Sequence, residues 1–234
     1  MMEKRKIKYK VKSGEFSGVV FDAHEYNINV HSREIFLHSY HHNDWEDEEP
    51  GMDYRMTSVF IKNMRLLNNQ GPENILIHQQ SCGGDWNYGM AIYDAIIASE
   101  APVVILAYGQ ARSMSSITLQ AAKRRVLMPD CDVLIHHGTL GFDDRVTPVV
   151  SAVKYAEDHD KKRMLEIYAN RCVTGKYFKQ KHMKIASVTK FILKKMQEKT
   201  DWIMSAKQAV SYGFADGILG TTGFKTISSI RSRI

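Results

Sequence analysis

Three polar residues have the types that a nucleophilic hydrolase needs: a serine, a histidine and a carboxylate. Ser113 follows the apolar run PVVILAYG (102–109) and opens a helix-forming segment. A serine at such a strand-to-helix junction can present its hydroxyl at a sheet edge, where the next N–H and the helix N-terminus favour an oxyanion. Serine is also a preferred helix N-cap. The local pattern therefore leaves a nucleophile and a cap open.

The candidate base and acid lie further along the chain. His136 and His137 end the segment DVLIHH (132–137), from which an imidazole could reach the serine. Asp201 opens the segment DWIMSAKQAVSYGFADGIL and could orient and charge that histidine. Structural roles are the alternatives: a strand histidine in the core, and an acid at a helix N-terminus or in solvent.

Paired glycines supply a candidate ligand-binding turn. Gly83 and Gly84 lie between an expected strand and an expected helix. Without Cβ atoms they let a ligand lie against the backbone and bond its N–H groups. A tight turn with no ligand is the alternative reading.

The cysteines and the other histidines give little indication of a metal site or a disulfide. The three cysteines show no Cys-x-x-Cys spacing, so neither a disulfide framework nor a thiolate zinc site is expected. His41 and His42 lie beside an acidic loop and could bind a metal, but we expect them to be solvated. His78 is expected to be a core residue with a hydrogen-bonded ring.

Alternating apolar and amphipathic segments must position these residues. Strands are expected at residues 18–23, 27–30, 33–37, 75–81, 102–109, 126–129 and 132–137. Helical spacing of apolar residues predicts helices at about 53–69, 86–99, 113–122, 145–172 and 177–200. Ile7, Tyr9 and Val11 alternate with lysines, which is typical of an exposed edge strand or an arm. Strand–helix alternation predicts an α/β fold with parallel strands and right-handed crossovers.

Composition excludes several classes. The 234 residues are 44% hydrophobic and 25% charged, which is ordinary for a globular protein and argues against wholesale disorder. No run of 18 apolar residues predicts a membrane span, and the N-terminus lacks the apolar stretch of a secretory signal. Together with the cysteine usage, this favours a cytoplasmic protein.

The net charge of +6 is concentrated outside the middle of the chain. Residues 1–14 carry a net +5 and residues 154–199 a net +8, whereas residues 74–153 carry −2. A basic balance suggests nucleic acid, but no nucleic-acid-binding motif is present, so that partner is not expected. The charge favours altered assembly or docking surfaces.

The order of the motifs resembles the proteolytic subunit of the Clp protease over roughly residues 30–220. The blocks that carry the resemblance are REIFL (33–37), SCGG (81–84), GMAIYDAI (89–96), GQARSM (109–114), MPDCDVLIHH (128–137) and MSAKQAVSYGFADGIL (204–219). The family has Ser-Pro-Gly-Gly, Gly-Gln-Ala-x-Ser-Met and Met-Ile-His-Gln at the corresponding places. His137 occupies the position of that Gln.

The resemblance implies a crotonase-like α/β spiral of βαβ units with a long handle helix. It implies that Ser113 is the nucleophile, His136 the general base and Asp201 the orienting acid. The backbone N–H groups of Gly84 and Met114 would form the oxyanion hole. It implies no metal or cofactor in this chain, since ATP would be used by a partner AAA+ unfoldase.

Domain organisation and assembly follow from the same resemblance. We expect a basic arm at 1–30, a peptidase domain at 31–220 with a handle region at about 145–200, and a tail at 221–234. A homo-oligomer is implied, as a heptameric ring or double ring that hydrolyses peptides or unfolded proteins.

Departures from the family pattern keep other readings open. Cys82 replaces the proline of the Gly-Gly turn, Arg112 replaces a small residue, and extra length falls at about 176–186. The N-terminal stretch is basic where the family has an apolar segment that gates the pore and contacts the unfoldase, so docking of an unfoldase stays open. These departures fit a divergent, phage-encoded branch. The alternatives are a crotonase-type CoA-thioester enzyme and a non-catalytic or capsid-scaffold-processing relative.

Overall fold

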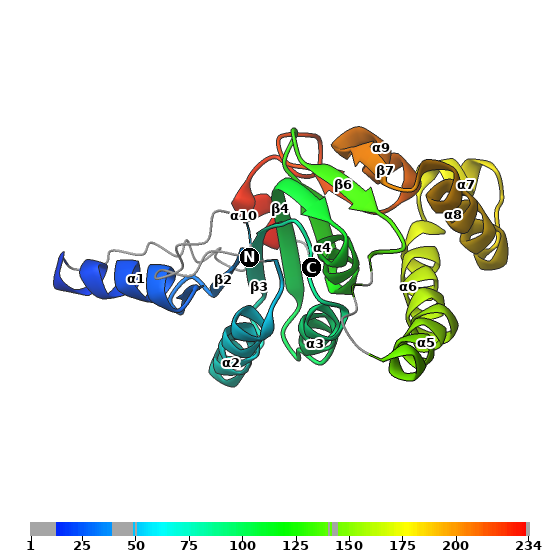
Figure 1. Cartoon of the computed structure of the whole chain (residues 1–234). Helices are drawn as coiled ribbons and strands as arrows, with labels where there is room; N and C mark the ends of the chain where they lie inside the picture. The colour runs from blue at the N-terminus through cyan, green and yellow to red at the C-terminus, as the bar shows by residue number, and fades with distance from the viewer. Residues whose placement is uncertain (1–12, 39–48, 50, 140, 142–144, 233–234) are drawn as a thin grey trace.

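A single mixed sheet forms the centre of the protein (Figure 1). The computed structural model describes residues 13–38, 49, 51–139, 141 and 145–232. Its strands are β1 (Ile28–Asn29), β2 (Glu34–His38), β3 (Ile75–Ser81), β4 (Val103–Arg112), β5 (Arg124–Leu127), β6 (Asp132–Ile135), β7 (Trp202–Ser205) and β8 (Gly217–Ile218). The order is β1-β2-β3-β4-β5-β8, and β6 joins β4 to β7. Strands β2, β3, β4, β5 and β8 run parallel to one another, as expected, whereas the short β1 pairs with β2 in antiparallel register.

Strand β4 divides the sheet into two parts. Its residues Val104–Ala107 pair with β5, whereas Gln110–Arg112 pair with β6. Strand β7 then pairs with β6 in antiparallel register. The carboxyl end of β4 therefore lies beside the end of β6, which brings distant segments of the chain together at one edge.

Helices cover both faces of this sheet. They are α1 (Ser13–Glu25), α2 (Tyr54–Gln70), α3 (Trp86–Ile97), α4 (Met114–Thr118), α5 (Val146–Tyr155), α6 (Lys161–Cys172), α7 (Lys176–Gln180), α8 (Ile185–Lys199), α9 (Ala206–Tyr212) and α10 (Ile227–Arg231). The main core contains Ile75, Ile77 and Ile105, with α2, α3 and α4 over that face (Figure 1). A smaller cluster of Leu76, Val104, Leu106 and Val126 packs against Ile230 of α10. Burial on both faces explains the nearly continuous apolar runs of β3 and β4.

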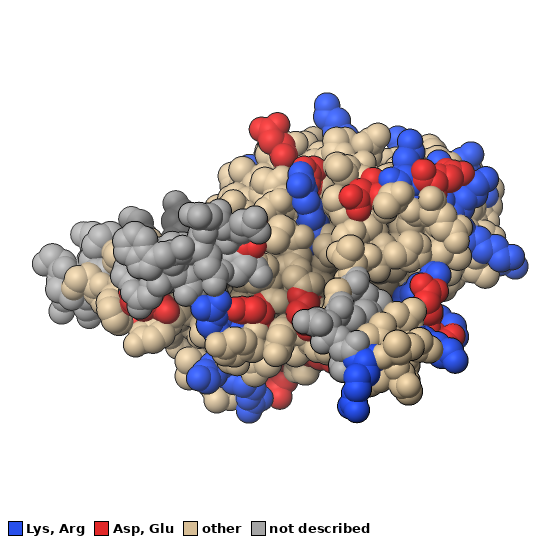
Figure 2. Space-filling model, in the orientation of Figure 1, with Lys and Arg blue, Asp and Glu red and all other residues tan. Residues whose placement is uncertain are grey.

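The predicted long helix at 145–172 is confirmed. Helices α5 and α6 join through a π-helical turn at Ala156–Asp160. The stretch predicted at 177–200 forms α7 and α8, separated by a turn. Aromatic rings attach these helices to β7 and α9: Tyr177, Phe178, Phe191, Trp202 and Tyr212. Lys and Arg side chains crowd the α7–α8 end of the molecule with acidic side chains among them (Figure 2).

One expectation of secondary structure was wrong, and one strand was not predicted. Residues 18–23 belong to helix α1 and form no strand. A short apolar run fits a helix turn as well as a strand, so the run alone could not decide. Residues 202–205 form strand β7, which the sequence did not predict. The expected edge strand near Ile7–Val11 and most of the acidic loop 41–51 lie outside the described residues, and the domain boundaries stay predictions.

An ion pair between the buried Arg125 of β5 and Asp216, which precedes β8, provides a stability test. Arg125 is 3% exposed and donates to Asp216, to Gln120 Oε1 at 2.7 Å and to the Gly213 carbonyl at 2.8 Å. We expect Asp216→Ala to lower the free energy of unfolding by about 3 kcal/mol, because it leaves a buried guanidinium without its carboxylate. Urea denaturation measures this. Glu198→Ala, which breaks an exposed pair with Lys195, should leave the midpoint unchanged; equal shifts would contradict the prediction.

Candidate active site

Ser113 occupies a strained turn between β4 and α4. Its φ of 51° and ψ of −124° are unfavourable for a residue with a Cβ. The Ser113 N–H donates to the Leu134 carbonyl of β6 at 2.9 Å, which holds the turn against the neighbouring strand. Its side chain caps no N–H of α4 in the described structure. The helix-cap reading is therefore wrong.

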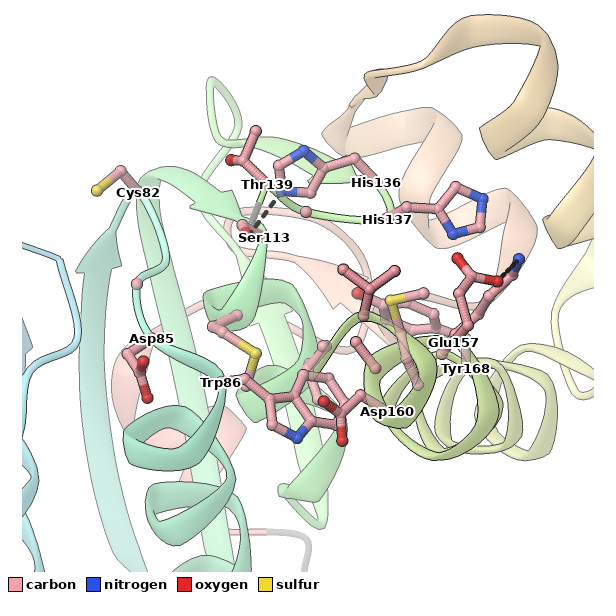
Figure 3. Close-up of a pocket in the computed structure, with 18 residues that line it drawn as sticks. Cys82, Asp85, Trp86, Ser113, His136, His137, Thr139, Glu157, Asp160 and Tyr168 are labelled. Atoms are coloured by element: carbon pink, nitrogen blue, oxygen red, sulfur yellow. Dashed lines mark hydrogen bonds and ion pairs between the residues drawn. The ribbon is translucent and has the colours of Figure 1, made fainter. Parts of the chain in front are cut away.

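The side chains of Ser113, His136 and Asp201 lie in a hydrogen-bonded row. The Ser113 Oγ lies 2.8 Å from His136 Nε2, and His136 Nδ1 lies 3.0 Å from Asp201 Oδ1 (Figure 3 draws the serine and histidine). The three residues come from the β4–α4 turn, the end of β6 and the residue before β7. The structure thus brings together the three side chains that the sequence singled out.

Strand register accounts for this arrangement. Ile135 is paired with Trp202 in the antiparallel β6–β7 ladder. The next residue outward on each strand is His136 and Asp201, so the ladder places them opposite each other. Arg112 is paired with Leu134 in the parallel β4–β6 ladder, which brings Ser113 to the same edge.

Hydrogen bonding determines what this row can do chemically. A carboxylate only accepts, so Asp201 favours the imidazole tautomer with the proton on Nδ1. The lone pair on His136 Nε2 then accepts from the Ser113 hydroxyl and can remove its proton. The Asp201 side chain is 56% exposed and the His136 side chain 23% exposed.

His137 points to a different part of the cavity. Figure 3 shows its ring directed toward Glu157, away from Ser113. Partial burial and the nearby Lys161 ammonium lower the pKa of His137. Lys161 in turn donates to Glu157 at 2.8 Å. Of the two adjacent histidines, His136 is the one that reaches the serine.

The Gly83–Gly84 turn approaches Ser113 so closely that a side chain would not fit. A Cβ on Gly83 would lie 2.6 Å from Ser113 Cβ and 3.0 Å from the Met114 nitrogen. The Gly83 carbonyl accepts from the Met52 N–H at 2.6 Å. Because a trans peptide is planar, the Gly84 N–H points away from Met52. The turn therefore not only changes the direction of the chain but also sets the direction of the Gly84 N–H.

The peptide between Ser113 and Met114 is anchored in the same way. The Ser113 carbonyl accepts from the Ser116 N–H at 2.9 Å and from the Ser116 hydroxyl at 2.6 Å. The Met114 N–H therefore points to the opposite side of the peptide plane. Gly84, Ser113 and Met114 all line one cavity, so their N–H groups can face a reacting carbonyl oxygen there.

This cavity has a volume of about 580 Å³ and is shown in Figure 3. Its apolar walls include Trp86, Ile117, Val153 and Met164, and α6 adds polar groups at one side. A hollow of this size and composition can hold side chains of a substrate next to the serine hydroxyl.

Two departures from the family pattern have local explanations. The N–H of Cys82, which a proline would lack, donates to Glu49 Oε1 at 2.9 Å. Burial and the Glu49 carboxylate raise the pKa of Cys82, which disfavours the nucleophilic thiolate. Arg112 makes a bidentate pair with Asp132 at 2.8 and 2.5 Å, so it ties β4 to β6.

The remaining candidates lie away from the row. His78 Nδ1 lies 2.9 Å from the Tyr108 hydroxyl, so the expected structural role is confirmed. His41 and His42 lie outside the described residues. Within the described ranges, no group of three His, Cys, Asp or Glu side chains could hold a metal ion. In the same part of the chain, no helix is long and apolar enough to span a membrane.

Sequence reasoning missed the residues that hold the two turns. Met52 acts through its backbone N–H, and no pattern of side chains in the sequence indicates such a role. Glu49 belongs to the acidic loop, for which the sequence predicts no contact with the Gly83–Gly84 turn. Ser116 and Tyr168 form a buried hydrogen bond at 2.6 Å, and the adjacent hydroxyls of Ser115 and Ser116 were the only signal near it.

The fold and the hydrogen-bonded row define an α/β protein with a Ser-His-Asp arrangement at a sheet edge. The Clp protease family matches residues 49–222, and the chain belongs to this family of peptidases. Its fold is the α/β fold of that family with a long handle helix. Proteolytic subunits of the family form oligomeric rings with unfoldase partners.

Two curated relatives have the same family name. The ATP-dependent Clp protease proteolytic subunit of Deinococcus radiodurans is 27% identical over 175 residues, which cover 73% of this chain and 78% of the relative. The ATP-dependent Clp protease proteolytic subunit 2 of Tropheryma whipplei (strain Twist) is 29% identical over 170 residues, which cover 71% of this chain and 86% of the relative.

Proposed function

We propose that the protein is a serine endopeptidase with Ser113 as nucleophile, His136 as general base and Asp201 as the orienting acid. The 2.8 Å contact between Ser113 Oγ and His136 Nε2 carries this proposal, because it joins the strained serine to a base. The same row favours acyl transfer on serine over CoA-thioester chemistry, for which no serine–histidine contact is needed.

The reaction would proceed through an acyl-enzyme. Ser113 Oγ attacks the scissile carbonyl while its proton passes to His136 Nε2. The N–H groups of Gly84 and Met114 stabilise the negative oxygen of the tetrahedral intermediate. Imidazolium, stabilised by Asp201, then gives its proton to the leaving amine. Water, activated by the same histidine, attacks the ester and releases Ser113.

Each of these roles uses groups of the protein alone. We therefore propose that the chain needs no metal or cofactor for hydrolysis and that any ATP is consumed by a partner unfoldase. The names of the two relatives, both ATP-dependent, support such a partner. Peptides and unfolded proteins are the proposed substrates.

Exposed apolar side chains support assembly into a ring. Helix α5 buries none of its residues, and Val146 is 78% exposed. Tyr54, Leu66 and Ile97 on α2 and α3 are each more than half exposed. Association would remove these surfaces from water.

Native mass spectrometry tests the assembly. We expect a closed oligomer of seven subunits or a double ring of fourteen, by analogy with the family. Val146→Asp on α5 should weaken the oligomer, whereas Lys154→Asp on the same helix should weaken it less. A monomer across the micromolar range would contradict the proposal.

The catalytic assignment is tested by labelling with a fluorophosphonate, followed by peptide mapping. The proposal expects one modified residue, Ser113. A folded, assembled sample that takes up no label, or one labelled at Cys82 or Ser115, would overturn the assignment.

A further inference from the structure

Two buried hydroxyls form a directed chain behind the nucleophile turn. The Ser116 hydroxyl lies 2.6 Å from the Ser113 carbonyl oxygen and 2.6 Å from the Tyr168 hydroxyl. A carbonyl only accepts, so the one proton of Ser116 goes to Ser113 and Tyr168 must donate to Ser116. Ser116 is 0% exposed and Tyr168 1% exposed, so water does not compete for these bonds.

We propose that Ser116 and Tyr168 are positioning residues that aim the Met114 N–H at the oxyanion. The proposal rests on the proposed function, in which that N–H stabilises the tetrahedral intermediate. The Ser113 carbonyl and the Met114 N–H belong to one planar peptide, so fixing the carbonyl fixes the opposite N–H. Donors that hold the carbonyl therefore act on the oxyanion hole without touching the substrate.

The turn needs such an anchor because its backbone conformation is unfavourable. Ser113 has a φ of 51°, which relaxation of the turn would relieve. A second donor to this carbonyl is the Ser116 N–H at 2.9 Å, so loss of the Ser116 hydroxyl would leave the carbonyl more weakly held. A rotation of the peptide would then turn the Met114 N–H away from the developing charge.

Tyr168 is itself held rigidly. Its ring packs edge-to-face on Phe214 at 5.4 Å between centroids, and Phe214 packs on Trp202 at 5.9 Å. Trp202 follows Asp201 directly in the chain. Burial raises the pKa of the Tyr168 phenol, so this hydroxyl stays protonated as a donor. Helix α6 thus contacts the serine turn through Tyr168, and Phe214 connects the same ring to the segment that carries the acid.

Kinetics of four variants test the proposal. We expect Ser116→Ala to lower kcat about 10-fold with KM changed less than about 2-fold, because a misaimed oxyanion donor loses part of the 10²–10³-fold effect of one donor. Tyr168→Phe should lower kcat by roughly 3-fold, since Ser116 can still donate to the carbonyl. The double variant should match Ser116→Ala, because both changes act through one hydrogen bond.

Ser115→Ala is the matched control. Ser115 is equally buried on the same short helix, but its hydroxyl has no hydrogen-bond partner among the described residues. We expect it to keep the kcat of the unmodified protein. Rates are normalised to active sites by fluorophosphonate titration, so that loss of folded protein does not count as loss of kcat.

Two further readouts separate positioning from a merely structural bond. The pH profile of kcat/KM should keep its shape in all four variants, because His136 and Asp201 are untouched. Ser116→Ala should melt roughly 2–4 °C below the double variant, because it leaves the Tyr168 hydroxyl buried without a partner.

The possible failures are distinguishable. If Ser116→Ala loses thermal stability but keeps full kcat per active site, or raises KM instead, the positioning role is wrong. If Ser113→Ala is inactive in that same experiment, the proposed function stands. If Ser113→Ala remains active, the proposed function itself fails.

Discussion

Peptide hydrolysis should fall by about 10⁴-fold or more when Ser113 is replaced by alanine, because the acyl-enzyme can no longer form. The substitution removes one oxygen from a partly buried turn. It also removes the hydroxyl that His136 Nε2 contacts at 2.8 Å. The remaining rate would come from water acting in a cavity that still holds the oxyanion donors. A fluorogenic peptide, assayed with assembled protein, measures the change.

The control is the neighbouring serine. Ser115→Ala removes the same atom two residues further along the chain and should leave hydrolysis unchanged. KM for the Ser113 variant should stay close to that of the unmodified protein, because the cavity walls are intact. Retained hydrolysis in a protease-free Ser113→Ala preparation would assign the chemistry to another residue, with Cys82 the first to test.

The closeness of Ser113 and His136 could be predicted because each residue follows an apolar strand segment. Parallel strands bring their carboxyl ends to one edge of a sheet, so Ser113 after β4 and His136 after β6 had to lie near each other. The placement of Asp201 was harder. It depends on strand β7, a four-residue segment whose partner β6 lies about 70 residues earlier in the chain. The residues alone offered Asp201 as a candidate acid with a helix end or a solvated charge as the alternatives, and the resemblance assigned it the orienting role.

What the sequence could not predict is the backbone that aims the two N–H groups. Met52 supports the Gly83 carbonyl through its own N–H, and any residue except proline can make that bond. The Ser116–Tyr168 bond joins residues 52 positions apart on separate helices. Helix spacing alone marks Tyr168 as a core residue. It does not indicate that the Tyr168 hydroxyl forms a hydrogen bond, because the partner lies on another helix.

The structure also shows on which elements the basic residues at 154–199 lie. The basic residues at 154–199 lie on the handle helices, where pairs such as Lys195–Glu198 are exposed. Residues 74–153, which carry Ser113 and His136, are slightly acidic. The excess positive charge of residues 154–199 therefore lies mainly on the handle helices, the distribution expected if it serves assembly or docking.

Asp201→Asn should lower kcat by about 10³-fold while leaving KM and the fold unchanged. An asparagine of the same shape can turn its amide N–H toward His136 Nδ1, which favours the tautomer with the proton on Nε2. That nitrogen could then no longer accept the Ser113 proton. We expect a smaller loss than the roughly 10⁴-fold known for a buried triad carboxylate, because the Asp201 side chain is 56% exposed and water can partly replace it.

Steady-state kinetics and fluorophosphonate labelling together measure this effect. The label should react with Ser113 more slowly in Asp201→Asn, since the activation of the hydroxyl is impaired although the hydroxyl is present. Glu198→Gln, the same change of acid to amide on α8, should leave both rates unchanged. A loss of less than about 10-fold would show that His136 keeps its reactive tautomer without Asp201, and the role of the acid would then pass to another group.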